Sequence, residues 1–247
     1  SPNKEIPLKS ALEKILQHPT VANKKFLITI GDRSVGGLTH RDQMAGPWQV
    51  PVSDVAVTMS SFSALSGEAM SMGERTPMAV LNPTASCQMA VAESITNLMA
   101  ADLESLSDIK LSCNWMAATG ENDDDLALWE GVEAIKDLCP IFGIAVPVGK
   151  DSLSMRARWQ DGESYTVKSP LSLVVSAFAP VSEVTKTLTP ALTKDKDTVL
   201  LFVDLGRGQN RLGGSIVQEI QKSLHGATPE VDAELLLKAF KANQSLR

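Results

Sequence analysis

Histidine, cysteine and aromatic residues are scarce in this sequence, and each scarcity argues against a class of site. The chain holds three histidines, too few to favour a His-based metal centre. Its three cysteines are odd in number and widely spaced without a CxxC pair, so neither a zinc ribbon nor a disulfide framework is indicated. Aromatic residues make up 4% of the chain, which argues against the base-stacking surfaces of single-strand nucleic-acid binders.

Long apolar runs and blocks of one charge are also missing. No run approaches the ~20 apolar residues of a membrane-spanning helix, and no signal peptide opens the chain. The net charge of −6 is spread along the sequence, unlike the basic patch of a nucleic-acid binder. Unpaired cysteines and nine methionines fit a reducing compartment. We therefore expect a cytoplasmic protein that binds neither nucleic acid nor membrane.

The length and the two ends bear on domain organisation. A chain of 247 residues accommodates one or two domains and a sizeable core. Ser1-Pro2-Asn3 is not a natural translation start, and Arg247 stands inside a lysine-rich helical pattern. We expect a piece of a longer polypeptide, although proteolytic maturation would produce the same ends.

The stretch 49–97 carries the clearest chemical pattern. A β-rich run holds Asp54, and a helix expected over 85–102 holds Glu93 and Asn97. Residues four apart share one face of a helix, and a strand end could bring Asp54 to them. Two carboxylates and one amide oxygen suit a hard cation such as Mg²⁺ with a phosphate. The alternative is that Glu93 and Asn97 belong to a solvated helix face.

Two further segments are candidates for ligand binding. The glycine-rich loop 31–43 carries Arg33, His40 and Arg41, which suit an anion, although the P-loop spacing is absent and a flexible hairpin loop is the alternative. An apolar strand expected over 141–148 runs into Gly-Lys-Asp-Ser at 149–152, where α/β proteins often place ligands. A plain hairpin with 156–159 is the alternative there.

Residue periodicity predicts the remaining elements. Helices are predicted over 8–17, 85–102, 126–138 and 230–246, with a short one over 67–75. Strands are predicted over 25–30, 50–59, 77–81, 109–112, 141–148 and 171–179. The polar segment 182–197 is typical of a linker, and the apolar run 199–205 is expected to begin a second core.

Five motifs in order carry a family resemblance. They are GDRSVGGLTHRDQMAGPWQVPVSDVAVT, GEAMSMGER, AVAESITN, LSCNWMAA and PVGKDSLSMRARW. Together they resemble phosphoribosylformylglycinamidine synthase in its large single-chain form, from about residue 8 to the end of the chain. Each motif alone is a weak signal, and the ordered set is specific.

The resemblance implies a fold and a domain division. It implies an α/β (α+β) fold with a mixed sheet and helices on one face, as in aminoimidazole-ribonucleotide synthetase. The chain is similar to the second of two tandem synthetase-like repeats, without the first repeat and the glutaminase domain. The implied division is a helical lead-in over 1–22, an ATP-binding-type domain over 23–181, a linker over 182–197 and a truncated C-terminal α/β domain over 198–247.

The resemblance also implies an activity. The family is a ligase of de novo purine biosynthesis that converts formylglycinamide ribonucleotide, ATP and glutamine to the amidine, ADP, phosphate and glutamate. ATP activates the formamide oxygen as an iminophosphate, and ammonia from the glutaminase displaces the phosphate. Implied cofactors are Mg²⁺ and ATP or ADP, and implied partners are the first repeat and the glutaminase domain. In the family, the sheets of two such domains associate. We therefore expect that this chain can form a homodimer through the same sheet.

Site residues follow from the resemblance position by position. The metal ligands of an auxiliary nucleotide site fall on Asp54, Glu93 and Asn97, in agreement with the pattern above. Nucleotide-contacting positions fall on Ser53 and Lys24.

The catalytic residues themselves stay unassigned. The resemblance implies two nucleotide sites, one auxiliary and one catalytic, formed by two repeats that are related by pseudo-symmetry. The loop 31–43 is then expected to reach the catalytic site, which makes Arg33 and His40 candidates there, together with Lys150 and Ser152.

Two competing hypotheses remain. One is another ATP-binding enzyme of the superfamily, similar to selenophosphate synthetase or thiamine-monophosphate kinase, against which the matches at 31–48 and 148–159 argue. The other is a non-catalytic nucleotide-binding or dimerisation module. We expect the isolated chain to lack the complete activity.

Overall fold

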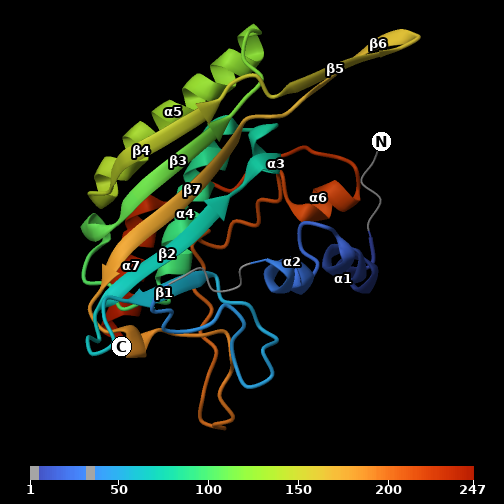
Figure 1. Cartoon of the computed structure of the whole chain (residues 1–247). Coiled ribbons are helices and arrows are strands. Elements are labelled where there is room, and N and C mark those ends of the chain that lie inside the picture. The colour runs from blue at the N-terminus through green and yellow to red at the C-terminus, as the bar shows by residue number, and fades with distance from the viewer. Residues whose placement is uncertain (1–5, 32–36) are drawn as a thin grey trace.

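A five-stranded mixed sheet organises the molecule, which is a computed structural model that describes residues 6–31 and 37–247 (Figure 1). The strands follow the order β1 (Val55–Met59), β2 (Gly67–Glu74), β7 (Ser172–Val181), β3 (Lys110–Met116) and β4 (Ala145–Ser152). The β3–β4 pair is parallel and the other pairs are antiparallel. The predicted α/β class with a mixed sheet is confirmed.

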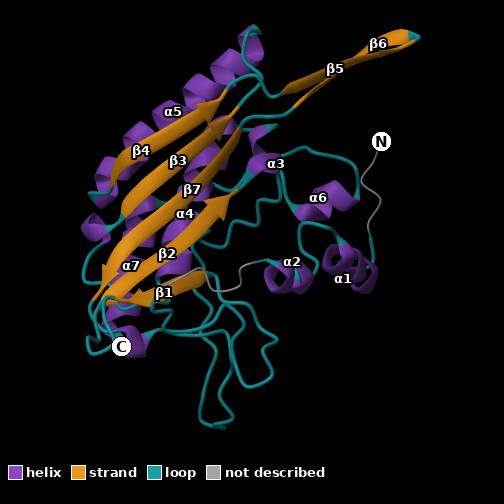
Figure 2. Ribbon diagram, in the orientation of Figure 1, coloured by secondary structure: helices purple, strands orange, loops and turns teal. Residues whose placement is uncertain are grey.

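One face of the sheet is covered by helices. The covering helices are α4 (Pro83–Leu98), α5 (Asn122–Phe142) and α7 (Ala233–Ser245), which lie behind the sheet in Figure 2. Side chains alternate across β2 and β7, with every second residue buried against this layer. The core contains Ile95 and Leu98 of α4 and Val175 and Ala177 of β7, each fully buried.

Shorter elements surround this two-layer body. They are α1 (Leu8–Gln17), α2 (Lys25–Ile30), α3 (Thr76–Ala79), α6 (Ile216–Ile220) and the 3₁₀ turns Leu106–Asp108 and Val184–Lys186. In Figure 1, α1, α2 and α6 lie together beside the sheet. No helix in the described part of the chain is long and apolar enough to cross a membrane.

Helix α4 approaches β2 unusually closely. The residues of β2 that face the helix are small: Gly67, Ala69, Ser71 and Gly73. A Cβ atom placed on Gly73 would lie 1.9 Å from the Ala90 carbonyl oxygen and 2.7 Å from the Ser94 nitrogen. The Ser71 hydroxyl donates to the Ser94 carbonyl at 2.7 Å, which ties the two elements together. The helix backbone therefore rests directly on the strand.

The start of α4 is set by local sequence. The Asn82 side chain accepts a hydrogen bond from the Ala85 amide at 2.9 Å, and Pro83 occupies the first turn. An asparagine cap satisfies an amide that has no partner within the helix, and proline is tolerated at this position because its missing N–H is not needed there.

Three predicted elements change type in the structure. Residues 25–30 were predicted as a strand and form α2, which lies outside any sheet. The preference of β-branched residues for strands depends on packing against a neighbouring strand, and none is present here among the described residues. Residues 67–75 were predicted as a short helix and form β2, since their small side chains alternate between helix layer and open face. Residues 77–81 were predicted as a strand and contain the end of α3, with Pro77 in its first turn.

The Gly-Lys-Asp-Ser segment lies within a strand instead of following one. Strand β4 continues to Ser152, and the chain then enters a hairpin of β5 (Arg156–Asp161) and β6 (Glu163–Lys168). Gly162 connects the two strands at a φ of +70°, which glycine adopts without strain. Trp159 and Tyr165 stack with ring centroids 5.3 Å apart. The hairpin projects away from the body (Figure 1).

The C-terminal part adds side chains to the core beneath the sheet. The five residues 199–203 are each more than 60% exposed, so the second core expected there is not seen in the described residues. Leu236 and Phe240 of α7 are instead buried in the cluster beneath the sheet. The Gln244 side chain accepts from the Leu103 amide at 3.1 Å and donates to the Ala101 carbonyl at 3.2 Å.

The close contact at Gly73 predicts a large effect of adding one methyl group. Gly73→Ala should lower the free energy of unfolding by about 1–3 kcal/mol or more, because backbone atoms of α4 must move. Gly149→Ala on β4 is the matched control, since its Cβ would lie 3.6 Å from the nearest atom, the Cys113 carbonyl oxygen. Urea unfolding of both variants measures the difference. Equal midpoints would show that the contact is looser than described.

Candidate functional site

The site is built where the ladder between β1 and β2 ends. The last pair is Val55 with Ser71, and β2 continues for three residues beyond it. Beyond this pair, side chains of α4 make hydrogen bonds to the backbone of β2 in place of β1. The Asn97 amide nitrogen donates to the Met72 carbonyl at 3.0 Å, and Glu93 Oε2 accepts from the Glu74 amide at 2.8 Å. Both side chains are half-buried, so they do not form a solvated helix face.

Asp54 and Ser53 arrive at the same point from the other side. Asp54 immediately precedes the first residue of β1, and within the described residues its carboxylate makes no hydrogen bond or ion pair. The Ser53 amide donates to the Gln43 carbonyl at 2.8 Å. Asp54, Glu93, Asn97 and Ser53 all line one cavity of about 770 Å³. The start of β1 thus places Asp54 on the same cavity as Glu93 and Asn97.

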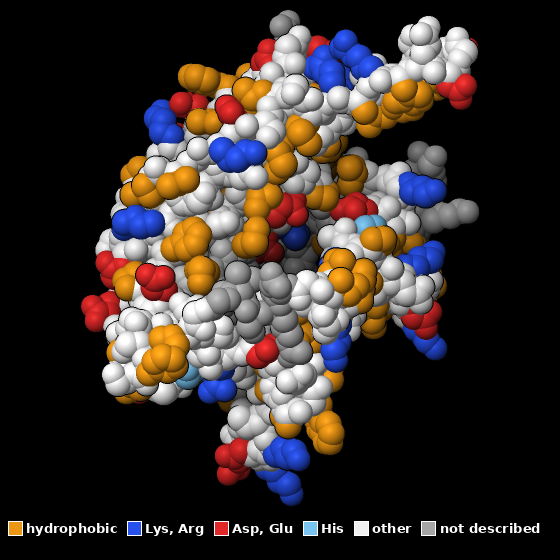
Figure 3. Space-filling model, in the orientation of Figure 1, with side chains coloured by type: hydrophobic (Ala, Val, Ile, Leu, Met, Phe, Trp, Pro, Cys, Tyr) orange, Lys and Arg blue, Asp and Glu red, His pale blue; other side chains and the backbone are white. Residues whose placement is uncertain are grey.

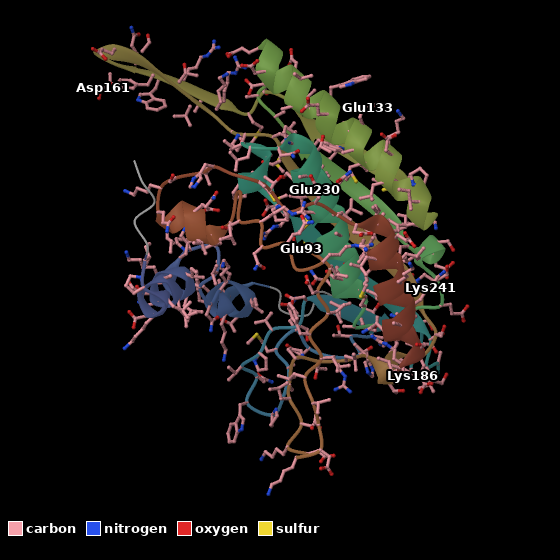
Figure 4. All side chains as sticks on the ribbon, turned by 180° about the vertical axis from the view of Figure 1, so that it is seen from behind. Glu93, Glu133, Asp161, Lys186, Glu230 and Lys241 are labelled. Carbon is pink, nitrogen blue, oxygen red and sulfur yellow. The ribbon has the colours of Figure 1, made fainter. Side chains whose placement is uncertain are left out.

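The cavity extends along the open face of the sheet. Its floor includes Met72 of β2 and Ser176 and Phe178 of β7. Its far wall comes from the segment around α6, including Glu219. Figure 3 shows a hollow on this face with acidic side chains near it, and Figure 4 shows Glu93 from behind, on α4.

The donor set fits a hard cation that also holds a phosphate. Each α4 side chain uses one atom on the backbone of β2, which leaves the second Glu93 oxygen and the Asn97 carbonyl oxygen for another partner. No three His, Cys, Asp or Glu side chains among the described residues are grouped closely enough to hold a metal alone. A cation here would rely on Asp54, Glu93 and Asn97 together with water and ligand oxygens, as Mg²⁺ commonly does.

Lys24 is not among the residues that line this cavity. Its ammonium group donates to the carbonyls of Thr20 and Ala22 at 2.9 and 3.0 Å and so closes its own loop. Thr20 and Val21 do reach the cavity. Arg33 lies outside the described residues.

His40 lies beside β1. Its amide donates to the Val57 carbonyl at 2.9 Å, which extends the sheet edge by a short bridge. Its Nε2 atom is buried without a hydrogen-bond partner in the described structure. Burial lowers the pKa of His40, and the charge of Arg41 lowers it further, so the ring is neutral at pH 7. A neutral imidazole can accept a proton or a hydrogen bond.

Lys150 and Ser152 lie on β4, at the opposite edge of the sheet. The Lys150 ammonium donates to the Ser152 hydroxyl at 3.1 Å, and the two residues align with Asn114 and Met116 of β3. Four strand spacings of about 4.8 Å separate β1 from β4, or roughly 19 Å. The structure therefore does not bring Lys150 and Ser152 to Asp54.

The three cysteines belong to the core. Cys87, Cys113 and Cys139 are all buried and free. Burial raises the pKa of Cys87 and Cys113 to about 12 and that of Cys139 to about 11. Since the thiolate is the reactive form, these thiols are inert at neutral pH.

Arg75 and Glu219 are among the charged cavity residues that the sequence analysis did not name as site candidates. Arg75 follows β2 directly, and Glu219 comes from α6, 144 positions later in the chain. Glu219 Oε2 lies 3.6 Å from His18 Nε2, which connects α6 to the loop after α1. Arg75 stands inside the quoted GEAMSMGER motif, so a signal existed for it. Nothing local marks Glu219, because its place depends on how distant segments pack.

Comparison with known proteins identifies the family. A family model described as the FGAR-AT PurM_N-like domain matches residues 23–180. Among solved structures, PurLQS from Thermotoga maritima is 22% identical over 69% of this chain and 25% of its own, with a TM-score of 0.51. T. maritima PurL complexed with AMPPCP is 22% identical over 68% of this chain and 26% of its own, with a TM-score of 0.50.

These likenesses differ in what they establish. At 22% identity the structural matches show a shared fold, and this chain spans about a quarter of the length of the solved chains. The family model covers most of the chain, including the strand end and the helix that line the cavity. This chain belongs to the FGAR-AT PurM_N-like domain family.

Proposed function

We propose that this chain is the ATP-binding-type part of a phosphoribosylformylglycinamidine synthase, the second synthetase-like repeat of a large single-chain enzyme. In this proposal it carries an auxiliary Mg-nucleotide site at Asp54, Glu93 and Asn97. The whole enzyme, a cytoplasmic ligase, converts formylglycinamide ribonucleotide, ATP and glutamine to the amidine. The first repeat and a glutaminase domain supply the remaining machinery. The proposed division keeps 1–22 as lead-in, 23–181 as this domain, 182–197 as linker and 198–247 as the start of the next domain.

One observation carries the proposal. Asp54, Glu93 and Asn97, from two segments nearly 40 residues apart, line the same cavity beside Ser53. Their oxygens suit a divalent cation bound with a phosphate. The family match at 23–180 and the complex of T. maritima PurL with ADP support a nucleotide as the ligand.

Each side chain has a part in holding that ligand. Asp54 has no other described partner and supplies charge, while Glu93 and Asn97 are held in place by their bonds to Glu74 and Met72. Bound Mg²⁺ would neutralise the phosphate oxygens. The Ser53 hydroxyl and, after a change in its loop, the Lys24 ammonium would contact the nucleotide.

The remaining candidates are proposed to serve the catalytic site of the whole enzyme. His40, Lys150 and Ser152 do not line the cavity of the auxiliary site, and Arg33 lies outside the described residues. His40 is neutral and can accept a proton. Lys150 and Ser152 share a bond on an exposed strand edge, where a substrate or a partner domain can reach them.

A purely structural module is the competing function. Glu93 and Asn97 make hydrogen bonds to backbone groups of β2 that β1 does not pair with, and these bonds need no ligand. Asp54 makes no comparable bond in the described residues, so Asp54 distinguishes the two functions.

Asp54→Asn should weaken binding of ADP in the presence of Mg²⁺ by about tenfold or more, because a charge-assisted contact of roughly 1.5–3 kcal/mol is lost. The stability of the fold should not change, since the side chain is exposed. Calorimetric titration of the chain with Mg-ADP measures the affinity. Asp161→Asn at the hairpin tip is the control. Equal affinities for both variants would favour the structural module.

The chain by itself should not convert formylglycinamide ribonucleotide to the amidine with ATP and ammonium. Lys150 and Ser152 lie at the opposite edge of the sheet from Asp54 and His40, so neither group closes around a substrate without another domain. Product formation is followed by chromatography, with phosphate release as a second readout. Turnover by a clean preparation of this chain would contradict the proposed division of labour.

The open sheet face should pair with a second copy of the chain at high concentration. Met72, Val148 and Phe178 on this face are between 43% and 58% exposed, an apolar surface that favours association. Phe178→Glu should shift the equilibrium to monomer, whereas Leu126→Glu on α5 should not. Sedimentation equilibrium measures both. A wild-type chain that stays monomeric at millimolar concentration would rule out this pairing.

A further inference from the structure

Arg75 is the one cation among the described residues that line the large cavity. Four carboxylates line it as well: Asp54, Glu74, Glu93 and Glu219. A bare phosphate would be repelled by this excess of negative charge. A phosphate that enters with a divalent cation brings compensating charge, and its remaining oxygens need a donor.

Arg75 makes no ion pair or side-chain hydrogen bond within the described part of the chain, although carboxylates line the same cavity. Two of them, Glu74 and Glu93, accept hydrogen bonds from backbone amides instead. Glu93 accepts from the Glu74 amide at 2.8 Å, and Glu74 accepts from the Thr76 amide. An arginine beside acids would ordinarily pair with one of them, and here one oxygen of each of these two acids accepts from a backbone amide instead.

The other acids near Arg75 also have partners. A second cavity of about 330 Å³ shares Arg75 and Glu93 with the first and is lined by Glu230 and Asp232 as well. Glu230 pairs with Arg211 at 2.8 Å, and Asp232 pairs with Arg207 at 2.5 Å. Glu219 lies 3.6 Å from His18. Arg75 therefore lines both cavities, and its guanidinium has no bonding partner among the described residues.

The backbone at Arg75 is held firmly. Its carbonyl accepts from the buried Ser86 hydroxyl at 2.7 Å and from the Met78 amide at 3.1 Å. Residue 75 directly follows Glu74, whose amide is bound by Glu93. The backbone of Arg75 is thus fixed next to the residue whose amide holds Glu93, a proposed cation ligand, while its guanidinium makes no bond within the described residues.

We propose that Arg75 is the phosphate-binding residue of this site. It takes the phosphate oxygens that the cation does not hold, on the opposite side of the ligand from Asp54. The planar guanidinium offers two parallel donors to a phosphate, which a lysine cannot reproduce. This inference rests on the proposed function and adds the anion-binding half of the site. The ligand class is a nucleoside diphosphate or triphosphate with its divalent cation.

Binding measurements that compare ligands with and without phosphate test the proposal. Arg75→Ala should weaken Mg-ADP and Mg-pyrophosphate binding by about tenfold or more, while adenosine binding stays unchanged. Mn²⁺ binding without a nucleotide, followed by electron paramagnetic resonance, should be equal to wild type or tighter, since a repelling charge is removed. Arg75→Lys should recover part of the loss. Arg158→Ala on the projecting hairpin is the control.

The outcomes separate this inference from the proposed function. If wild-type chain binds Mg-ADP and Arg75→Ala binds it equally, Arg75 has no such role and the proposed function stands. If Mn²⁺ binding falls together with ADP binding, Arg75 acts on the structure of the site and the inference is wrong. If the wild-type chain binds neither Mg-ADP nor Mg-pyrophosphate, both proposals fall.

Discussion

The contact between α4 and β2 at Gly73 is the constraint on which the site depends. With no side chain at this position, the helix backbone rests on the strand, and any Cβ would overlap the Ala90 carbonyl. At this separation Glu93 and Asn97 bond to the backbone of the strand at Glu74 and Met72. The same contact buries Ile95 and Leu98 against the sheet. Packing of the core and placement of the polar side chains therefore have one cause.

The charge distribution of the cavity follows from where each acid finds a partner. The backbone amides of Glu74 and Thr76 donate to Glu93 and Glu74, respectively. Basic side chains from the C-terminal segment pair with Glu230 and Asp232. Asp54 and Arg75 are left, one of each sign, facing the same space. A ligand that carries both a cation and phosphates matches this pair. The C-terminal segment thus shapes the cavity even though its apolar residues 199–203 are exposed.

Much of the fold was predictable where periodicity and length agree. The helices at 8–17, 85–102, 126–138 and 230–246 are present, with shifts of a few residues at their ends. Short apolar stretches were the failures. Residues 25–30 and 77–81 have strand composition and became α2 and parts of a helical turn, because no neighbouring strand is available to them. Residues 67–75 were misread since small side chains carry no hydrophobic alternation, yet they form β2.

The sequence by itself determined the residue types of the site and the family. The spacing of Glu93 and Asn97 requires a shared helix face, and Asp54 breaks a β-rich run. Only the tertiary structure decided that these three share a cavity, that Lys24 closes its own loop instead, and that Lys150 and Ser152 occupy the far edge of the sheet. Local spacing cannot encode these relations, because strand order and helix placement arise from burial of side chains distant in the chain. The absence of a side-chain partner for Arg75 among the described residues is of the same kind, since it depends on the partners that Glu93, Glu230 and Asp232 find elsewhere.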